Sequence, residues 1–419
     1  MDKILNRICS IKAHPIMELE ERFRLIYLKG LGACLYTISK NNSVTKMFFI
    51  AWAQSILKEH REETSFWNED LSAIKQAIAI HRKGFRFFSM KYSFFFDVFY
   101  LITDSIEYNK RDTYQFLREK ICGWFTKGAL EEVYAYYNNK EAPTKVAPEL
   151  ISHRNKNREY LVQPLKKVLV VANVSTGKST LINALVGHSL NKVRTTACTN
   201  KIVKLYNKRD SDGVTIKKAN NTYEYHSDLE NVDSDLFSEA AFPFNSLLAN
   251  KNICFIDTPG VNNATELDHR TITEEAIKRE DYDMVIYVSN AKYFATTDEK
   301  NILIHLYRMV NKPILFVLNQ LDQFKQKEDS ITKMLDDYKE ILLNIGFKNP
   351  IVIPISAKTA FLFKQDDSTL DEDELFEKEL LTKKFQKDYY NLAAYTNYSD
   401  YTNLLERTGI IALERLLMN

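Results

Sequence analysis

Two patterns of apolar residues follow each other along the chain. From about residue 18 to 137 they recur at helical spacing, for example at Leu19, Phe23 and Ile26, which predicts a helical bundle. Beyond residue 165 they form short runs rich in β-branched residues, separated by helical stretches. This alternation predicts a largely parallel sheet flanked by helices. The runs that predict its strands are residues 168–171, 202–205, 253–256, 284–288, 314–318 and 351–355.

The stretch from residue 138 to 164 separates the two patterns. It loses the helical periodicity and gathers turn-forming and charged residues, so we expect a connection there. An acidic stretch after Lys364 leads into a terminal helical region. The predicted organisation is an all-α helical domain with its linker over residues 1–150, an α/β domain over residues 151–365 and a C-terminal helical segment over residues 366–419.

The amino-acid composition disfavours several classes of protein for this chain. The 57 Lys and Arg nearly balance the 55 Asp and Glu, so we expect no nucleic-acid partner. The five cysteines form no CxxC pair, which argues against a disulfide framework or a zinc site and favours a reducing, cytoplasmic compartment. The start of the chain lacks the apolar core of a signal peptide. The aromatic segment 85–102 is interrupted by charges, so we expect a core helix there, with contact to a membrane surface as the alternative.

A phosphate-binding loop follows the first predicted strand. Residues 172–179 read Ala-Asn-Val-Ser-Thr-Gly-Lys-Ser and lie between that strand and a predicted helix. In such a loop Lys178 reaches the β- and γ-phosphate oxygens and the Ser179 hydroxyl ligates Mg²⁺. Ala172 stands where the first glycine is usual, which requires a negative φ. The predicted phosphate-binding residues are Asn173, Val174, Ser175, Thr176, Gly177, Lys178, Ser179 and Thr180.

Two further motifs belong beside the γ-phosphate. The second apolar strand delivers Asp257 to its carboxyl end, where it is expected to hold Mg²⁺, and Gly260 follows to donate its N–H to the γ-phosphate. A threonine between the P-loop and Asp257 is needed as another magnesium ligand. Thr196 is favoured and Thr195 comes next, although both could simply precede a strand.

A third strand ends with a motif that predicts guanine recognition. The Asp322 carboxylate can accept two hydrogen bonds from guanine N1 and N2, a pair of donors that adenine lacks. Asn319 belongs to the same motif, and Gln320 replaces the lysine whose stem usually covers the base, so we expect looser base packing. The Ala357 N–H is expected to face guanine O6, between Ser356 and Lys358 on either side of the base.

Together these elements resemble the P-loop GTPase superfamily and, within it, the dynamin-like GTPases, including bacterial and mitofusin-like members. The motifs that carry the resemblance are Gly-Lys-Ser-Thr-Leu-Ile-Asn-Ala-Leu-Val-Gly at 177–187, Thr-Thr-Ala at 195–197 and Asp-Thr-Pro-Gly-Val-Asn at 257–262. It covers about residues 165–362. The resemblance implies a P-loop GTPase domain that hydrolyses GTP to GDP with Mg²⁺.

The resemblance also implies how hydrolysis is activated. Val261 replaces the glutamine of Ras-like proteins, whereas dynamin-like proteins pair two GTPase domains and use a monovalent cation, K⁺ or Na⁺. Ser175 matches their cation-contacting serine, but Val174 replaces a polar glutamine of dynamin. The implied catalytic residues are Ser175, Lys178, Thr196 and Gly260, and the implied magnesium ligands are Ser179, Thr196 and Asp257.

The expected partners are GTP or GDP, a second copy of the chain and a peripheral membrane or a partner protein to be remodelled. The main alternative is a slow nucleotide-dependent switch that recruits partners through its N-terminal helical domain. A ribosome- or RNA-associated GTPase is a third possibility, which the near-neutral net charge of +2 disfavours.

Overall fold

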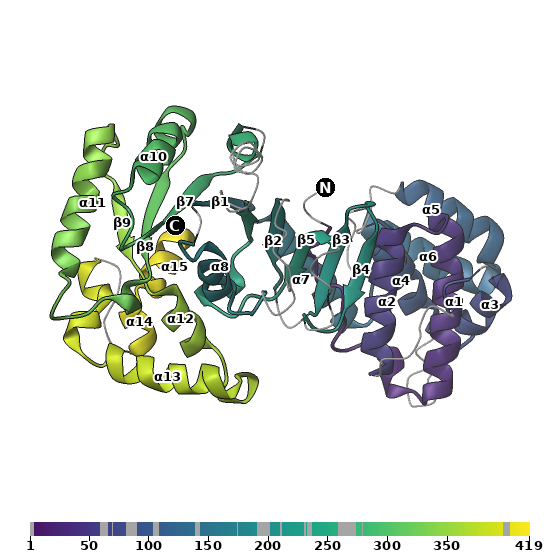
Figure 1. Ribbon diagram of the computed structural model, residues 1–419. Helices are drawn as coiled ribbons and strands as arrows, with labels where there is room; N and C mark the ends of the chain where they lie inside the picture. Colours follow the sequence, from purple (N-terminus) through teal and green to yellow (C-terminus); the bar gives the residue numbers. More distant parts are fainter. Residues whose placement is uncertain are drawn as a thin grey trace. The chain divides into compact units, whose positions relative to one another are not determined.

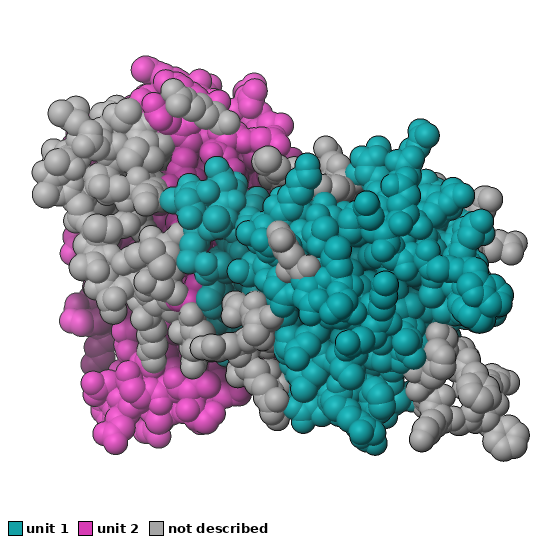
Figure 2. All heavy atoms as spheres, turned by 90° about the vertical axis from the view of Figure 1, so that its right-hand side faces the viewer, with its two compact units in different colours: residues 1–163, 211–231 teal, residues 164–210, 232–419 magenta. Residues whose placement is uncertain are grey.

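The computed structural model describes two compact units, coloured separately in Figure 2. Unit 1 comprises Met1–Gln163 and Ser211–Asn231, and unit 2 comprises Pro164–Asp210 and Val232–Asn419. The described residues are 4–58, 66–68, 70–80, 90–103, 109–138, 143–173, 175–190, 202–209, 212–229, 232, 237–258, 274–278, 280–396 and 403–419.

Unit 1 is helical, as the periodicity predicts (Figure 1). Its helices are α1 Glu21–Ser39, α2 Ser43–Leu57, α3 Leu71–Ile78, α4 Lys91–Thr103, α5 Lys110–Phe116, α6 Trp124–Tyr137 and α7 Pro148–Val162. A hairpin of β3 Val214–Lys218 and β4 Tyr223–His226 belongs to the same unit.

The core of unit 1 is rich in aromatic side chains. Phe94, Phe95 and Phe96 of α4 are fully buried, so the described part of the aromatic segment is a core helix, as expected. No helix within the described ranges is long and apolar enough to cross a bilayer. The core also holds the Asp97 carboxylate, which accepts hydrogen bonds from Tyr27 at 2.7 Å and Trp52 at 3.1 Å.

The predicted connection at residues 138–164 is wrong in its second half, because Pro148–Val162 forms the 15-residue helix α7. Its buried positions include polar residues, which hid the helical spacing from an apolar pattern. The Arg154 guanidinium lies 4.1 Å from the ring centroid of Tyr137, and the Asn157 side chain accepts the Ile8 N–H at 2.9 Å. These contacts compensate the burial of both polar groups.

Unit 2 contains seven neighbouring strands in the order β5-β2-β6-β1-β7-β8-β9. All adjacent pairs are parallel except β2 with β6, which confirms the predicted largely parallel sheet. The strands are β1 Lys166–Ala172, β2 Val203–Asn207, β5 Phe237–Phe242, β6 Ile253–Asp257, β7 Met284–Asn290, β8 Ile314–Asn319 and β9 Ile351–Pro354.

Helices flank this sheet in two groups (Figure 1). α8 Lys178–Val186 packs with α12 Ala357–Lys364 and with the C-terminal α15 Ile410–Met418, while α10 Thr297–Met309 packs with α11 Ile331–Ile345. Helices α13 Glu372–Phe385 and α14 Leu404–Arg407 also belong to this unit. Lys364 of α12 and Glu414 of α15 form a buried ion pair, which holds the C-terminal helix α15 against α12.

Candidate functional site

The central strand β1 places the P-loop at the carboxyl edge of the sheet. β6 and β7 flank β1 and run parallel to it, and β8 runs parallel to β7. Ala172, Asp257, Asn290 and Asn319 are the last residues of β1, β6, β7 and β8. Because parallel strands end on the same side, the predicted phosphate and guanine motifs meet at one edge.

Local backbone geometry explains which P-loop positions tolerate side chains. Ala172 keeps a strand backbone, which meets the requirement for a negative φ. Gly177 has φ +83°, and a Cβ there would lie 2.5 Å from Asn319 Nδ2, so only glycine fits. Ser175 adopts the left-handed region with φ +59°, an uncommon conformation for a residue with a side chain.

Lys178 and Asp257 form an ion pair in the site. Both side chains are more than nine-tenths buried, and Lys178 is the first residue of α8. Ser179 and Thr180 follow in the first turn of that helix, where free backbone N–H groups favour anions. The Asp257 carboxylate and the Lys178 ammonium therefore meet at the start of α8, where the sequence predicts phosphate and Mg²⁺ binding with the Ser179 hydroxyl.

Asn319 joins the guanine motif to the P-loop. Its Nδ2 donates to the Thr176 carbonyl at 2.9 Å, and its Oδ1 accepts the Ala357 N–H at 2.9 Å. The Ala357 N–H that the sequence assigned to guanine O6 thus bonds to Asn319 in this structure. The role of Asn319 is to hold three chain segments in register.

Gln320 makes contacts that its sequence position did not predict. Its Nε2 donates to the Ser175 carbonyl at 2.7 Å, and its Oε1 accepts from Asn290 Nδ2 at 2.8 Å. Gln320 itself has φ +69°. The residue that replaces the usual lysine therefore fastens the left-handed Ser175 to the end of β7.

Ser356 contacts Asp322, the carboxylate that the sequence predicts for base recognition. Its hydroxyl donates to Asp322 Oδ1 at 2.6 Å, and the Lys384 ammonium of α13 donates to the Asp322 main-chain carbonyl. Burial lowers the pKa of Lys384, and the nearby Asp322 carboxylate partly offsets this effect. Lys358, predicted beside the base, pairs instead with Glu377 at 2.5 Å.

Asn173 has a partner that sequence reasoning missed. Its Nδ2 lies 3.3 Å from Glu299 Oε2, and Glu299 is only 2% exposed. Burial raises the pKa of the Glu299 carboxyl, while hydrogen bonds from Ser289, Tyr287 and Asn173 oppose that rise. The sequence signal Thr-x-x-Glu at 296–299 indicates the start of a helix and gives no hint of this contact.

Three predicted site residues, Val174, Thr196 and Gly260, lie outside the described residues. The other predicted members, from Asn173 to Lys358, are described. The structure brings the P-loop residues, Asp257 and Asn319 together, and it places Asp322 beside Ser356.

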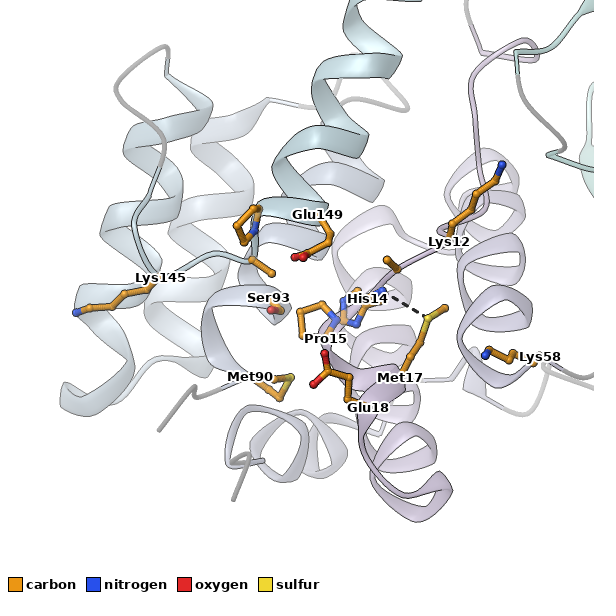
Figure 3. A pocket seen from close by; sticks show the side chains of 13 residues that line it. Lys12, His14, Pro15, Met17, Glu18, Lys58, Met90, Ser93, Lys145 and Glu149 are labelled. Carbon is orange, nitrogen blue, oxygen red and sulfur yellow. Dashed lines mark hydrogen bonds between the residues drawn. The ribbon is translucent and has the colours of Figure 1, made fainter. Parts of the chain in front are cut away.

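A separate cavity of about 450 Å³ lies in unit 1. Figure 3 shows His14, Ser93 and Glu149 among the residues that line it. His14 Nε2 lies 3.0 Å from Asp97 Oδ2, and its Nδ1 accepts the Ile16 N–H. Because both ring nitrogens are engaged, His14 has no free nitrogen for acid–base chemistry in this cavity.

Comparison with known proteins finds a family match that spans the predicted P-loop. Residues 168–321 match the model of the dynamin family. The chain is 28% identical over 271 residues to an uncharacterised protein from the xynA 3′ region of Caldicellulosiruptor sp. strain Rt8B.4, covering 60% of this chain and 62% of that protein.

Two eukaryotic proteins are also similar to the chain. The Saccharomyces cerevisiae mitofusin FZO1 is 27% identical over 42% of this chain and 24% of its own length. The Arabidopsis thaliana chloroplastic protein described as a probable transmembrane GTPase, FZO-like, is 27% identical over 48% of this chain and 20% of its own length. The chain thus spans under two thirds of the length of these curated relatives.

Among solved structures, a chain from an oligomerised bacterial dynamin pair, described as a mechanism for long-range sensing and tethering of membranes, is similar to this chain. It is 16% identical, the alignment covers 93% of this chain and 70% of that one, and the TM-score is 0.36. The sequence match and the motifs agree on one segment of the chain. Residues 168–321 are similar to the dynamin family, and the P-loop and the Asp257 motif lie within them.

Proposed function

We propose that unit 2 binds GTP with Mg²⁺ and hydrolyses it to GDP and phosphate. The observation that carries this proposal is the meeting of the P-loop with Asp257 and Asn319 at one edge of the sheet. In this proposal the phosphates of a guanine nucleotide lie at the ends of β1 and β6 and its base lies at the end of β8, on the same edge of the sheet. The match to the dynamin family supports the same reading.

The residues present fit a magnesium nucleotide. Ser179 and Asp257 offer the oxygen ligands that Mg²⁺ takes in phosphate sites, and Thr196 is the third proposed ligand. When bound, Mg²⁺ offsets the charge that develops on the β- and γ-phosphate oxygens. Lys178, now paired with Asp257, supplies the ammonium for the same oxygens, and the Gly260 N–H is proposed to complete the γ-phosphate contacts.

The proposed activation is dimerisation of two GTPase units with a monovalent cation at Ser175. Ser175 is exposed, and Val261 excludes the glutamine-dependent route. The test is GTP turnover per molecule over a concentration series, in K⁺ and in Na⁺ buffers, with light scattering on the same samples. A rate that rises with protein concentration supports the proposal. A flat, very slow rate with intact GTP binding favours the nucleotide switch that acts through unit 1.

A peripheral membrane role has a specific surface in unit 1. Trp124 is 81% exposed and Phe125 is 69% exposed, and their ring centroids lie 3.7 Å apart. They begin α6, and the sequence around them carries the exposed Arg118, Lys120 and Lys127, of which Lys127 pairs with Glu131 at 3.8 Å. Exposed aromatic rings next to cations fit the interface of an anionic bilayer.

Vesicle sedimentation tests this surface. Trp124→Ser with Phe125→Ser is expected to abolish sedimentation with vesicles containing phosphatidylserine and to leave GTP turnover in solution unchanged. The matched control is Phe376→Ser, because Phe376 is 70% exposed on α13 of the other unit. Equal sedimentation of the double variant and the wild type would remove the proposed membrane surface.

A further inference from the structure

A cluster of buried polar side chains lies behind the P-loop and reaches the loop at Asn173. Its centre is the Glu299 carboxylate in the first turn of α10. Oε1 accepts the Ser289 hydroxyl at 2.5 Å, and Oε2 accepts Asn173 Nδ2 at 3.3 Å. The Tyr338 hydroxyl of α11 lies 2.7 Å from Ser289 Oγ. β7, α10 and α11 are thereby connected to the Asn173 side chain of the P-loop.

Helix capping does not account for the position of Glu299. The N-cap of α10 is Thr296, whose hydroxyl accepts the Glu299 N–H at 3.4 Å. In a reciprocal capping box the glutamate carboxylate would turn back to the Thr296 N–H. The Glu299 carboxylate is engaged with Ser289 and Asn173 instead. A carboxylate buried this deeply is costly, so its contacts point to a role beyond starting the helix.

The P-loop needs such external supports. Ala172 and Ser175 stand at two positions where a glycine would give the backbone more conformational freedom, and Ser175 adopts φ +59°. The loop is fastened from outside at Ser175 by Gln320 and at Thr176 by Asn319. Glu299 is the third fastening and acts at Asn173, on the half of the loop that precedes α8.

The two halves of the loop serve different steps. The start of α8, with Lys178 and Ser179, holds phosphate and magnesium and so governs nucleotide affinity. The half from Asn173 to Ser175 carries the exposed residue of the proposed cation site. Fixing that half affects how the reacting groups are oriented more than how tightly the nucleotide binds.

We propose that Glu299 is a positioning residue for GTP hydrolysis, acting through Asn173 to set the first half of the P-loop. The inference rests on the proposed function. In Glu299→Gln one acceptor oxygen becomes an N–H₂ donor, which opposes either the Ser289 hydroxyl or the Asn173 amide. The loop then loses one fastening, whereas Lys178, Ser179 and Asp257 are unchanged.

The test is steady-state GTP turnover and equilibrium GTP binding by the full chain. Glu299→Gln is expected to lower kcat about tenfold and to change KM and Kd for GTP less than threefold. Asn173→Ala should lower kcat to a similar extent, and the double variant should be no slower than either single variant, because both changes break one contact. Glu414→Gln is the matched control, since Glu414 is another buried carboxylate of unit 2 but contacts Lys364. This variant should keep the wild-type kcat.

Other results of these measurements would overturn the proposed role of Glu299. A wild-type kcat in both single variants overturns the inference, and so do additive losses in the double variant. If Glu299→Gln does not fold, Asn173→Ala alone decides, because its side chain is only partly buried. Wild-type protein that binds GTP without turning it over refutes the proposed hydrolysis and this inference with it. Wild-type turnover with unaffected variants refutes only the inference.

Discussion

Asp322→Asn changes the acceptor pattern of one side chain and tests the guanine site directly. In the structure Asp322 Oδ1 accepts the Ser356 hydroxyl at 2.6 Å, which fixes the orientation of the carboxylate. The proposed contacts with guanine N1 and N2 use acceptor oxygens of this group. An asparagine offers one oxygen and one N–H₂ group, so a donor would face a donor of guanine.

The expected loss follows from the charge of the lost acceptor. A hydrogen bond to a charged group contributes about 1.5–3 kcal/mol, and an unpaired buried donor adds a further cost of the same order. We expect Asp322→Asn to weaken GTP binding by about 3 kcal/mol, or roughly a hundredfold in Kd. Xanthosine triphosphate should bind the Asp322→Asn variant more tightly than it binds the wild type, because xanthine carries a carbonyl oxygen where guanine carries the 2-amino group.

The assay is displacement of a fluorescent GDP analogue by GTP and by xanthosine triphosphate. Ser356→Ala is the matched control, because it keeps the carboxylate and removes only its orienting donor. This variant should lose about 1 kcal/mol of GTP affinity without gaining affinity for the xanthine nucleotide. A GTP Kd for Asp322→Asn within threefold of the wild type would refute the assignment of Asp322 to the base.

Three further changes test the site and its support. Lys178→Ala should abolish tight GTP binding in the same titration, because it removes the phosphate-binding ammonium; retained affinity would disprove the P-loop assignment. Glu414→Leu should lower the free energy of unfolding by about 3–5 kcal/mol in urea titrations by leaving Lys364 buried and unpaired, and adding Lys364→Met should recover much of it. Burial lowers the pKa of His188, so the neutral ring is favoured in the folded state. The free energy of unfolding should therefore decrease as the pH is lowered below the ordinary histidine pKa of about 6.5, and it should decrease less steeply in His188→Gln. Equal pH dependence of the free energy of unfolding in the two proteins would contradict this.

The strands that the sequence predicted are those buried on both faces of the sheet. Runs such as 168–171 and 314–318 are continuous and apolar because no face of these strands meets water. The missed strands β3, β4 and β5 lack that signal. All four residues of β4, Tyr-Glu-Tyr-His, are only partly buried, and β5 contains a polar Ser-Glu pair. The helix α7 was missed for a related reason, since its buried face includes Arg154 and Asn157.

In the candidate site, too, one group of residues could be predicted from the sequence and another could not. The predicted motifs are short contiguous strings, so the sequence alone predicts that Lys178, Asp257 and Asp322 lie at or shortly after the ends of strands in one sheet. The supports come from residues distant in the chain whose identity carries no local signal. Glu299 is 126 positions from Asn173, and Gln320 is 145 positions from Ser175. Only the packing of β7, β8 and α10 around β1 brings them to the loop.

The residues that support the P-loop are expected to affect kcat more than the Kd for the nucleotide. A glycine at the start of a P-loop gives the backbone freedom to follow the phosphates, and here Ala172 reduces that freedom. The loop conformation is then held by the side chains of Asn319, Gln320 and Glu299, which contact its carbonyls and its Asn173 side chain. Substitutions among these supports should therefore separate kcat from Kd, whereas substitutions at Lys178 should abolish tight nucleotide binding. A series in which every support variant lost affinity and rate in the same proportion would show that the loop acts as one binding element.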